Sequence, residues 1–290
     1  MGNPKKHQPT VRKGLAFPFQ VSVVCWVDLL GYGSMIAEAG FNPLHGKAID
    51  AMKRLRTFHE IVASKSNRYF PTLVLNDAAV SHRDLSLRSR SVTFDFLCRC
   101  WALFGAIREA EQKAEFPGAR MVIATGFRIR AKRTSPDPAT GHLGSILKRF
   151  DAGIVSAKQA ISEAVRARQS FGLVPELQTN FAFTKAYVAD QSGTRGGLKG
   201  ARCFVDLALF KNVPSSWLES DEQVIWKHDR LGLSATFLPV CNLRTNRHPE
   251  GGPTDIRDAL EVAQYLTRDS NVLKTLRSAQ LRSARQTIQD

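Results

Sequence analysis

The sequence predicts a mixed α/β fold in which a strand, a helix, two strands, a helix and another strand follow one another. Short apolar runs of strand length alternate with longer stretches whose apolar residues recur every three or four positions. The chain has 290 residues, of which 43% are hydrophobic and 23% charged. It is therefore long enough to bury a large core, and the composition excludes a chain that is disordered throughout.

The first half of the chain carries this order most clearly. The expected elements are a strand over 21–28, a helix over 45–65, a hairpin over 70–81, a helix over 92–113 and a strand over 121–127. The first strand is almost continuously apolar, which is typical of a strand covered on both faces. Asn76-Asp77 interrupts the hairpin and predicts its tight turn. Pro117-Gly118 ends the second helix.

The second half predicts fewer regular elements. Residues 131–144 hold two prolines and two glycines, which favours an inserted flexible loop. After it we expect helices over 150–172 and 178–192, a flexible loop over 193–200, strands over 203–209, 224–227 and 234–240, and a basic helix from about Thr254. The chain thus divides into a flexible basic N-terminus at 1–15, one α/β domain at 16–245 and a basic helical extension at 246–290.

The charge balance restricts the class of partner. The chain has 41 Lys and Arg against 26 Asp and Glu, a net charge of +15. Such an excess favours nucleic acid, nucleoside triphosphates or an acidic membrane surface, although it can also serve solubility alone. No apolar run approaches the roughly 20 residues that span a bilayer, so we expect a soluble, cytoplasmic protein without membrane insertion. Five cysteines without CxxC and seven histidines without HExxH predict no disulfide framework and no histidine metal site.

The clearest chemical signal is an aspartate at the end of the first apolar strand. Asp28 is followed at once by the turn Leu29 to Gly33. A carboxylate buried there must be hydrogen-bonded, paired or bound to a metal, because burial without a partner is costly. If the hairpin lies beside this strand, Asp77 at its tip is the natural second ligand, and two carboxylates with substrate phosphates commonly hold Mg²⁺. The alternative is that Asp28 caps a turn and Asp77 is an ordinary turn residue.

These motifs, in this order, resemble class III nucleotidyl cyclases. The resemblance begins with Asp28-Leu-Leu-Gly-Tyr32 on the first strand and the second Asp on the hairpin. Four later segments are similar to those of bacterial Pycsar-type pyrimidine (uridylate and cytidylate) cyclases: Arg120 to Gly126 (RMVIATG), Phe183 to Asp190 (FTKAYVAD), Arg202 to Asp206 (RCFVD) and His228 to Gly232 (HDRLG). The resemblance covers roughly residues 20 to 240 and implies a ferredoxin-like, class III cyclase-like catalytic domain. It explains neither the segment 131–144 nor the tail after 250.

The resemblance also implies roles for single residues. It makes Asp28 and Asp77 the ligands of two Mg²⁺ or Mn²⁺ ions. It offers Tyr69 and Arg120 as contacts to a pyrimidine base; the alternatives are that Tyr69 is a core residue and Arg120 a surface one. The backbone expected to pack against the triphosphate comprises Leu29, Leu30, Gly31, Tyr32 and Gly33.

One feature departs from the family. Class III cyclases usually supply an Asn and an Arg from a late helix of the partner subunit, where they stabilise charge on the transferring phosphate. The matching helix here has no Arg. Lys185 and the upstream Asn180 are the expected catalytic substitutes, although a lysine lacks the fork of a guanidinium.

The resemblance thus implies a homodimeric nucleotidyl cyclase that uses UTP or CTP. The products would be a 3′,5′-cyclic monophosphate (cUMP or cCMP) and pyrophosphate, made by two-metal catalysis, by analogy in antiviral defence against phage. Two other functions stay open. The missing Arg favours an inactive cyclase-like protein that binds a nucleotide or a partner. The net charge and basic tail favour a nucleic-acid-binding protein, although the aromatic residues are not interleaved with the basic ones as a stacking surface requires.

Overall fold

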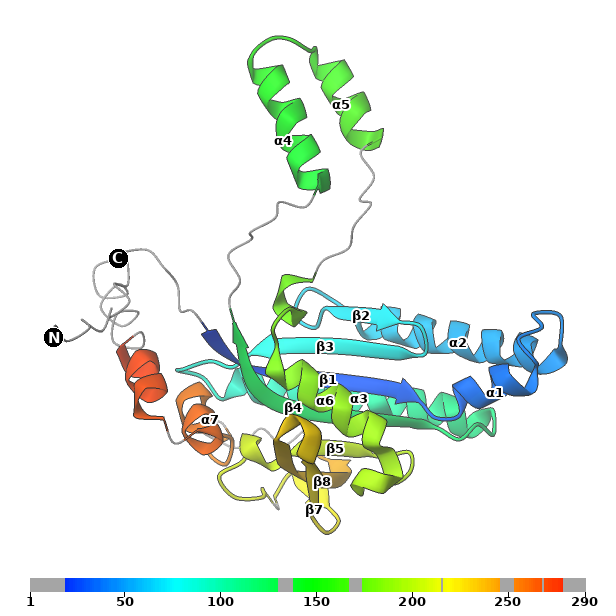
Figure 1. The fold of residues 1–290 in the computed structure, drawn as a ribbon, viewed down its shortest axis with the longest axis vertical. Helices are drawn as coiled ribbons and strands as arrows, with labels where there is room; N and C mark the ends of the chain where they lie inside the picture. Colours follow the sequence, from blue (N-terminus) through cyan, green and yellow to red (C-terminus); the bar gives the residue numbers. More distant parts are fainter. Residues whose placement is uncertain are drawn as a thin grey trace, which may run out of the picture.

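A mixed eight-stranded sheet forms the centre of the molecule (Figure 1). The computed structural model describes residues 19–129, 138–166, 174–214, 216–245, 253–267 and 269–278. The strand order is β2-β3-β1-β4-β5-β8-β6, with β7 paired to β8, and only β4 and β5 are parallel among these described neighbours. The strands are β1 (Phe19–Leu29), β2 (Thr72–Leu75), β3 (Ala78–Asp84), β4 (Ala119–Ile129), β5 (Cys203–Asp206), β6 (Leu218–Ser220), β7 (Val224–His228) and β8 (Leu233–Leu243).

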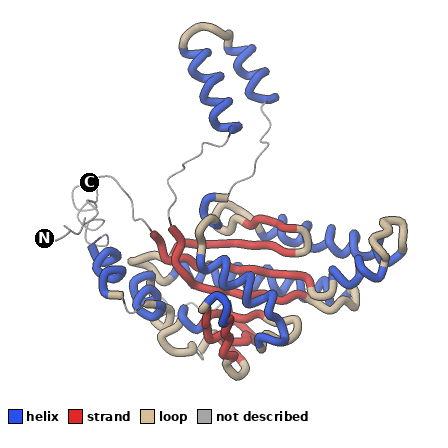
Figure 2. Tube along the Cα trace, in the orientation of Figure 1, coloured by secondary structure: helices blue, strands red, loops and turns tan. Residues whose placement is uncertain are grey.

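Helices pack on both faces of this sheet (Figure 2). The helices are α1 (Tyr32–Glu38), α2 (Gly46–Lys65), α3 (Ser91–Lys113), α4 (Pro138–Asp151), α5 (Ala157–Arg166), α6 (Phe181–Ser192) and α7 (Ala259–Leu266), and residues 270–278 are also helical. Helices α2 and α3 lie on one face and α6 on the other. The predicted order of strand, helix, hairpin, helix and strand is confirmed, with the short α1 added after β1.

Strand β1 divides the apolar residues between two cores. Successive side chains of a strand point to opposite faces. Val23, Cys25 and Val27 therefore enter the core beneath α2 and α3, whereas Val24 and Trp26 enter the core beneath α6. This double burial explains why the sequence of β1 is apolar at nearly every position. It also puts Asp28, in phase with Trp26, on the face covered by α6.

The hairpin of β2 and β3 lies beside β1, as predicted. Leu75 pairs with Ala78, so the turn consists of Asn76 and Asp77 alone. Asn76 has φ +57°, a conformation that asparagine tolerates better than most residues. The backbone N–H of Leu29 donates to the carbonyl oxygen of Asp77 at 3.0 Å. This bond fixes the hairpin tip to the end of β1.

A buried ion pair between α2 and α3 fixes the other side of that strand end. Arg54 Nε donates to Glu111 Oε1 at 3.0 Å, and both side chains are almost fully buried. The guanidinium also donates from Nη2 to the carbonyl oxygen of Leu30 at 3.0 Å. Glu111 in turn accepts from the backbone N–H of Gly118 at 3.1 Å. One buried pair thus joins two helices, the turn after Asp28 and the start of β4.

Several predictions in the second half of the chain are wrong in their bounds. Residues 138–144 begin α4 and are not loop, since a proline such as Pro138 is tolerated in the first turn of a helix; the rest of the predicted loop lies outside the described residues. The single helix over 150–172 is instead the end of α4 and the separate α5, because a turn with Gly153 at φ +68° intervenes. Strand β5 stops at Asp206, whose carboxylate accepts from Ala208 N–H at 2.9 Å and starts a 3₁₀ turn.

Helices α4 and α5 form a hairpin that stands off the sheet, and a salt bridge from Arg149 to Glu163 (2.9 Å) joins them (Figure 1). At the C-terminal end, Ile256, Val262 and Leu276 are buried in the same core as β1. The predicted N-terminal segment 1–15 lies outside the described residues. In the part of the chain that the structure describes, every helix is too short or too polar to cross a bilayer.

We expect Arg54→Met to lower the free energy of unfolding by about 3–5 kcal/mol, because it leaves the carboxylate of Glu111 buried without its partner. The double variant Arg54→Met/Glu111→Leu removes both charges and should lose less. Urea unfolding of wild type and both variants measures the difference. A single variant as stable as the wild type would contradict this account of the pair.

Candidate functional site

Asp28 lies at the end of β1 between two neighbouring strands. Its register partners are Ala78 on β3 and Arg120 on β4. Residues directly opposite one another in an antiparallel pair share a face of the sheet. The carboxylate of Asp28 and the guanidinium of Arg120 therefore lie on the same face, beside the C-terminal end of α6.

Asp77 approaches the same place from the hairpin. Both Asp28 and Asp77 are half-buried. The pKa of Asp28 is raised to about 7, chiefly by burial and also by the charges of Asp190 and Asp77, whereas Arg120 and Arg54 oppose this rise. The structure therefore brings the two predicted metal ligands into electrostatic contact, and it adds a third carboxylate that we did not predict as part of the site.

That third carboxylate, Asp190, comes from the last turn of α6 and holds Arg120. Arg120 Nη1 donates to the backbone oxygen of Asp190 at 3.0 Å and to its Oδ1 at 3.2 Å. The indole N–H of Trp26 donates to Oδ2 at 3.3 Å. Desolvation raises the pKa of Asp190, and the ion pair with Arg120 opposes that rise. Two features of the sequence could have indicated Asp190 as part of the site. It lies in the last turn of an apolar helix, and its partner Trp26 is in phase with Asp28 on β1.

Arg120 is buried and paired with Asp190, with 10% of its side chain exposed, and this pair does not use all of its donors. Its bonds to Asp190 use only Nη1, and its Nε is buried without a hydrogen-bond partner among the described residues. A guanidinium has five donors in a fixed fork that matches phosphate and carboxylate oxygens. Gly193 helps to seat it: this residue has φ +48°, and a Cβ there would lie 3.3 Å from Arg120 Nη1. The arrangement suits an anionic group beside Asp28.

Lys185 and Asn180, the predicted catalytic residues, are not brought to these carboxylates. Lys185 Nζ lies 2.9 Å from Asp206 Oδ2, and Asp206 also accepts from the hydroxyl of Thr125 at 2.8 Å. Thr125 is five residues from Arg120, about 17 Å along β4. Both Lys185 and Asp206 are buried. The charge of Lys185 therefore stabilises the packing of α6 and is not available to a substrate.

Asn180 has a structural role as well. It caps the N-terminus of α6, where its Oδ1 accepts from Phe183 N–H at 3.0 Å. Its Nδ2 lies 3.4 Å from Ser22 Oγ, six residues before Asp28 on β1 and therefore about 20 Å away along the strand. The side chain is buried, so it does not reach the carboxylates of its own chain.

The predicted nucleotide contacts are divided between two places. Tyr69 is exposed in the loop before β2, with the guanidinium of Arg68 4.4 Å from its ring centroid. Arg83, which donates to the Tyr69 carbonyl, pairs with Val23 at the far end of the hairpin from Asp77. The segment from Leu29 to Gly33, predicted to contact the triphosphate, does lie beside the site because it follows Asp28 directly. Its side chains at Leu29 and Tyr32 are buried and Leu30 is half-buried, whereas Gly31 and Gly33 are exposed.

The residues present fit a divalent cation that arrives with a phosphate. Asp28 and Asp77 offer hard carboxylate oxygens, and a cation would relieve the repulsion that raises the pKa of Asp28. Mg²⁺ is commonly held by one or two carboxylates together with substrate phosphates. Among the described residues, no group of three or more His, Cys, Asp or Glu forms a complete metal site.

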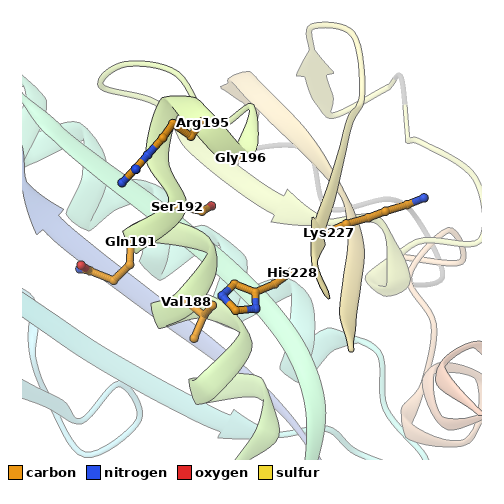
Figure 3. Close-up of a pocket in the computed structure, with 7 residues that line it drawn as sticks. All are labelled: Val188, Gln191, Ser192, Arg195, Gly196, Lys227 and His228. Carbon is orange, nitrogen blue, oxygen red and sulfur yellow. The ribbon is translucent and has the colours of Figure 1, made fainter. Parts of the chain in front are cut away.

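A concavity of about 470 Å³ lies between α6, the turn after it and β7, away from the three residues Asp28, Asp77 and Arg120, none of which lines it. Its lining residues are Val188, Gln191, Ser192, Arg195, Gly196, Lys227 and His228. Figure 3 shows that the side chains of Arg195 and Lys227 extend in different directions and do not converge on one point. We therefore place the candidate site at Asp28, Asp77 and Arg120.

No family model matches the sequence, and no curated protein matches it. Solved structures with a similar arrangement of elements include the guanylyl cyclase Cya2, at 12% identity over 79% of this chain and 95% of that chain (TM-score 0.47). The adenylyl cyclase CyaB from P. aeruginosa is similar at 11% identity over 79% of this chain and 98% of that chain (TM-score 0.49). A bacterial light-regulated adenylyl cyclase is similar at 10% identity over 91% of this chain and 59% of that chain (TM-score 0.40). At these identities the similarity concerns the fold, and the chemistry has to be inferred from the side chains.

The raised pKa of Asp28 predicts a pH-dependent stability in the metal-free protein. The folded state favours the protonated carboxyl of Asp28. The stability that this carboxyl contributes is therefore fully present below its unfolded pKa of 3.8 and is lost as the pH rises toward 7. We expect Asp28→Asn to raise the free energy of unfolding at pH 8 by on the order of 2–4 kcal/mol, with no difference near pH 4.

Urea unfolding in the presence of a chelator, at both pH values, measures this effect. Asp221→Asn is the matched control, because Asp221 is an exposed carboxylate paired with Arg202. An Asp28→Asn gain that is equal at the two pH values would show that burial of the charge is not its cause.

Proposed function

We propose that the chain is a nucleotidyl cyclase that converts a nucleoside triphosphate to a 3′,5′-cyclic monophosphate and pyrophosphate. The observation that carries this proposal is the convergence of Asp28 and Asp77 at one strand end, opposite Arg120, whose buried guanidinium is paired with Asp190 and leaves its Nε unbonded. Two carboxylates for cations and one arginine for phosphate oxygens are the groups that phosphoryl transfer requires.

In the reaction, the 3′-hydroxyl oxygen of the ribose forms a bond to the α-phosphorus. The bond from that phosphorus to the oxygen bridging the β-phosphate breaks, pyrophosphate leaves, and the hydroxyl proton passes to solvent. Two Mg²⁺ or Mn²⁺ ions bound at Asp28 and Asp77 would lower the pKa of the hydroxyl and neutralise phosphate charge.

The chain's own residues hold and orient the phosphates. Asp28 and Asp77 would hold the cations at the strand end. Arg120 donates to phosphate oxygens as charge develops, while Asp190 and Gly193 keep its guanidinium in place. The resemblance assigned Arg120 to the base, but its register position opposite Asp28 favours the phosphates.

Pyrimidine selectivity, homodimer formation and a role in antiviral defence also belong to the proposal, and the resemblance alone supports them. UTP or CTP is the proposed substrate. Tyr69 lies at the far end of the hairpin from Asp77, so it would contact a base at Asp28 only across a dimer interface. Homodimer formation would therefore be required for this residue to read the base.

One observation favours binding without catalysis as the second candidate function. Lys185, the expected substitute for the family's arginine, is buried in an ion pair with Asp206. Helix α6 therefore supplies no free cation in place of that arginine. A protein that binds the triphosphate at Asp28 and Asp77 and releases it unchanged would be consistent with this arrangement.

The test is to incubate the full chain with each of the four ribonucleoside triphosphates and Mn²⁺, and to detect cyclic monophosphate and pyrophosphate by mass spectrometry. We expect one cyclic product, and we expect Asp28→Ala and Asp77→Ala each to reduce it to the level without enzyme, because each removes a cation ligand.

Asp221→Ala is the control and should keep wild-type turnover, because this exposed ion pair contributes little. Full activity of Asp28→Ala would overturn the metal assignment. Triphosphate binding that depends on Asp28, without any product, would favour the second candidate.

A further inference from the structure

Tyr187 on α6 presents an exposed aromatic ring beside the candidate site. Its side chain is 42% exposed, although it lies only one helical turn before Asp190. One edge of the ring is held by Trp26, with centroids 5.2 Å apart and planes at 82°. Phe183 supports it from the preceding turn, with centroids 6.3 Å apart and planes at 25°. The ring is therefore fixed in position yet open to a ligand.

This ring is tied to the carboxylates by a short chain of contacts. Trp26 lies two residues before Asp28 on the same face of β1, about 7 Å away along the strand. Trp26 also donates to Asp190, which holds Arg120 opposite Asp28. Tyr187 thus stands one aromatic ring away from the proposed phosphate site.

The surface beyond Tyr187 is apolar on the side of the hairpin. Leu73 and Leu75 on β2 pair with Val80 and Ala78, which belong to the core beneath α6, so all four lie on this face. Leu73 and Leu75 are nevertheless exposed. The open part of this sheet face therefore has two regions. One carries the ring of Tyr187 and apolar side chains, and the other carries the carboxylates and Arg120. Base and phosphates of a nucleotide need these two environments.

We propose that Tyr187 is the platform on which the nucleobase stacks when the triphosphate is bound at Asp28 and Asp77. This inference rests on the proposed function and adds a substrate-binding residue to it. Stacking on an aromatic side chain tolerates every base, because every base has a π-face. Tyr187 therefore contributes affinity for nucleotides in general, and the choice of base lies with other contacts.

The test measures binding, so that it does not depend on turnover. The probes are the four 3′-deoxynucleoside triphosphates with Mn²⁺, which lack the attacking hydroxyl, and inorganic tripolyphosphate with Mn²⁺, which lacks the base. Titration calorimetry on the full chain gives each affinity. We expect Tyr187→Leu to weaken nucleotide binding by about 5- to 150-fold, the range measured when stacking residues are truncated, and to leave tripolyphosphate binding unchanged.

Two further variants separate stacking from loss of fold. Tyr187→Phe keeps the ring and should bind nucleotide within about threefold of the wild type, because the π-face is retained. Phe181→Leu is the matched control: Phe181 is 50% exposed on the same helix but at its other end, and its loss should leave both probes unaffected.

The outcomes distinguish this inference from the proposed function. A wild type that binds none of the triphosphates would overturn both. Wild-type binding with an unchanged Tyr187→Leu affinity would overturn the inference alone. An equal loss of nucleotide and tripolyphosphate would show that Tyr187 only positions Asp190. An equal loss of both affinities in Tyr187→Leu, together with an altered sedimentation coefficient, would show that the ring lies in an interface between copies of the chain. Either result would also overturn the inference.

Discussion

The position of the site depends on the buried ion pair between Arg54 and Glu111. This pair touches α2, α3, the carbonyl of Leu30 and the backbone of Gly118, so it links four segments at the point where β1 ends and β4 begins. Buried charges are expensive unless all their bonding capacity is used. Here the bonds to Leu30 and Gly118 use that capacity, and the same bonds fix the backbone on either side of Asp28. The position of the Asp28 carboxylate thus depends on hydrogen bonds that Arg54 and Glu111 make to the neighbouring backbone.

The same strand serves the core and the site through the alternation of its side chains. One set of β1 residues fills the core beneath α2 and α3, and the other set leads through Trp26 to Asp28. Asp28 is unfavourable for folding, since burial and neighbouring carboxylates oppose its charge. A large apolar core on the other face allows the fold to tolerate this cost. Active sites commonly retain such locally destabilising groups because function needs them.

Local patterns in the sequence predicted β1, the hairpin, α2, α3 and β4, because each has a clear period and an obvious turn or breaker. Asp28 and Asp77 could be brought together because a two-residue turn in a hairpin paired with β1 lies beside the end of that strand. The contacts of Asp190 could not be predicted, since Trp26 and Asp190 are 164 positions apart. The ion pair of Lys185 could not be predicted for the same reason, because nothing local indicates that Asp206 on β5 is its partner. The start of α4 was obscured by Pro138, Gly141 and Gly144, and its separation from α5 by a turn at Gly153.

The parallel pairing of β4 with β5 has a consequence for how the chain folds. The two strands are neighbours, yet the α4–α5 hairpin and α6 lie between them in the sequence. All strands from β1 to β4 come before this crossover, so their pairing can form early, as the chain closes its shorter loops. The entropic cost of closing a loop rises only slowly with the length of the loop. The α4–α5 hairpin is therefore an insertion that the sheet accepts at little kinetic or thermodynamic cost, and natural variation can lengthen, shorten or replace it while the strands stay as they are.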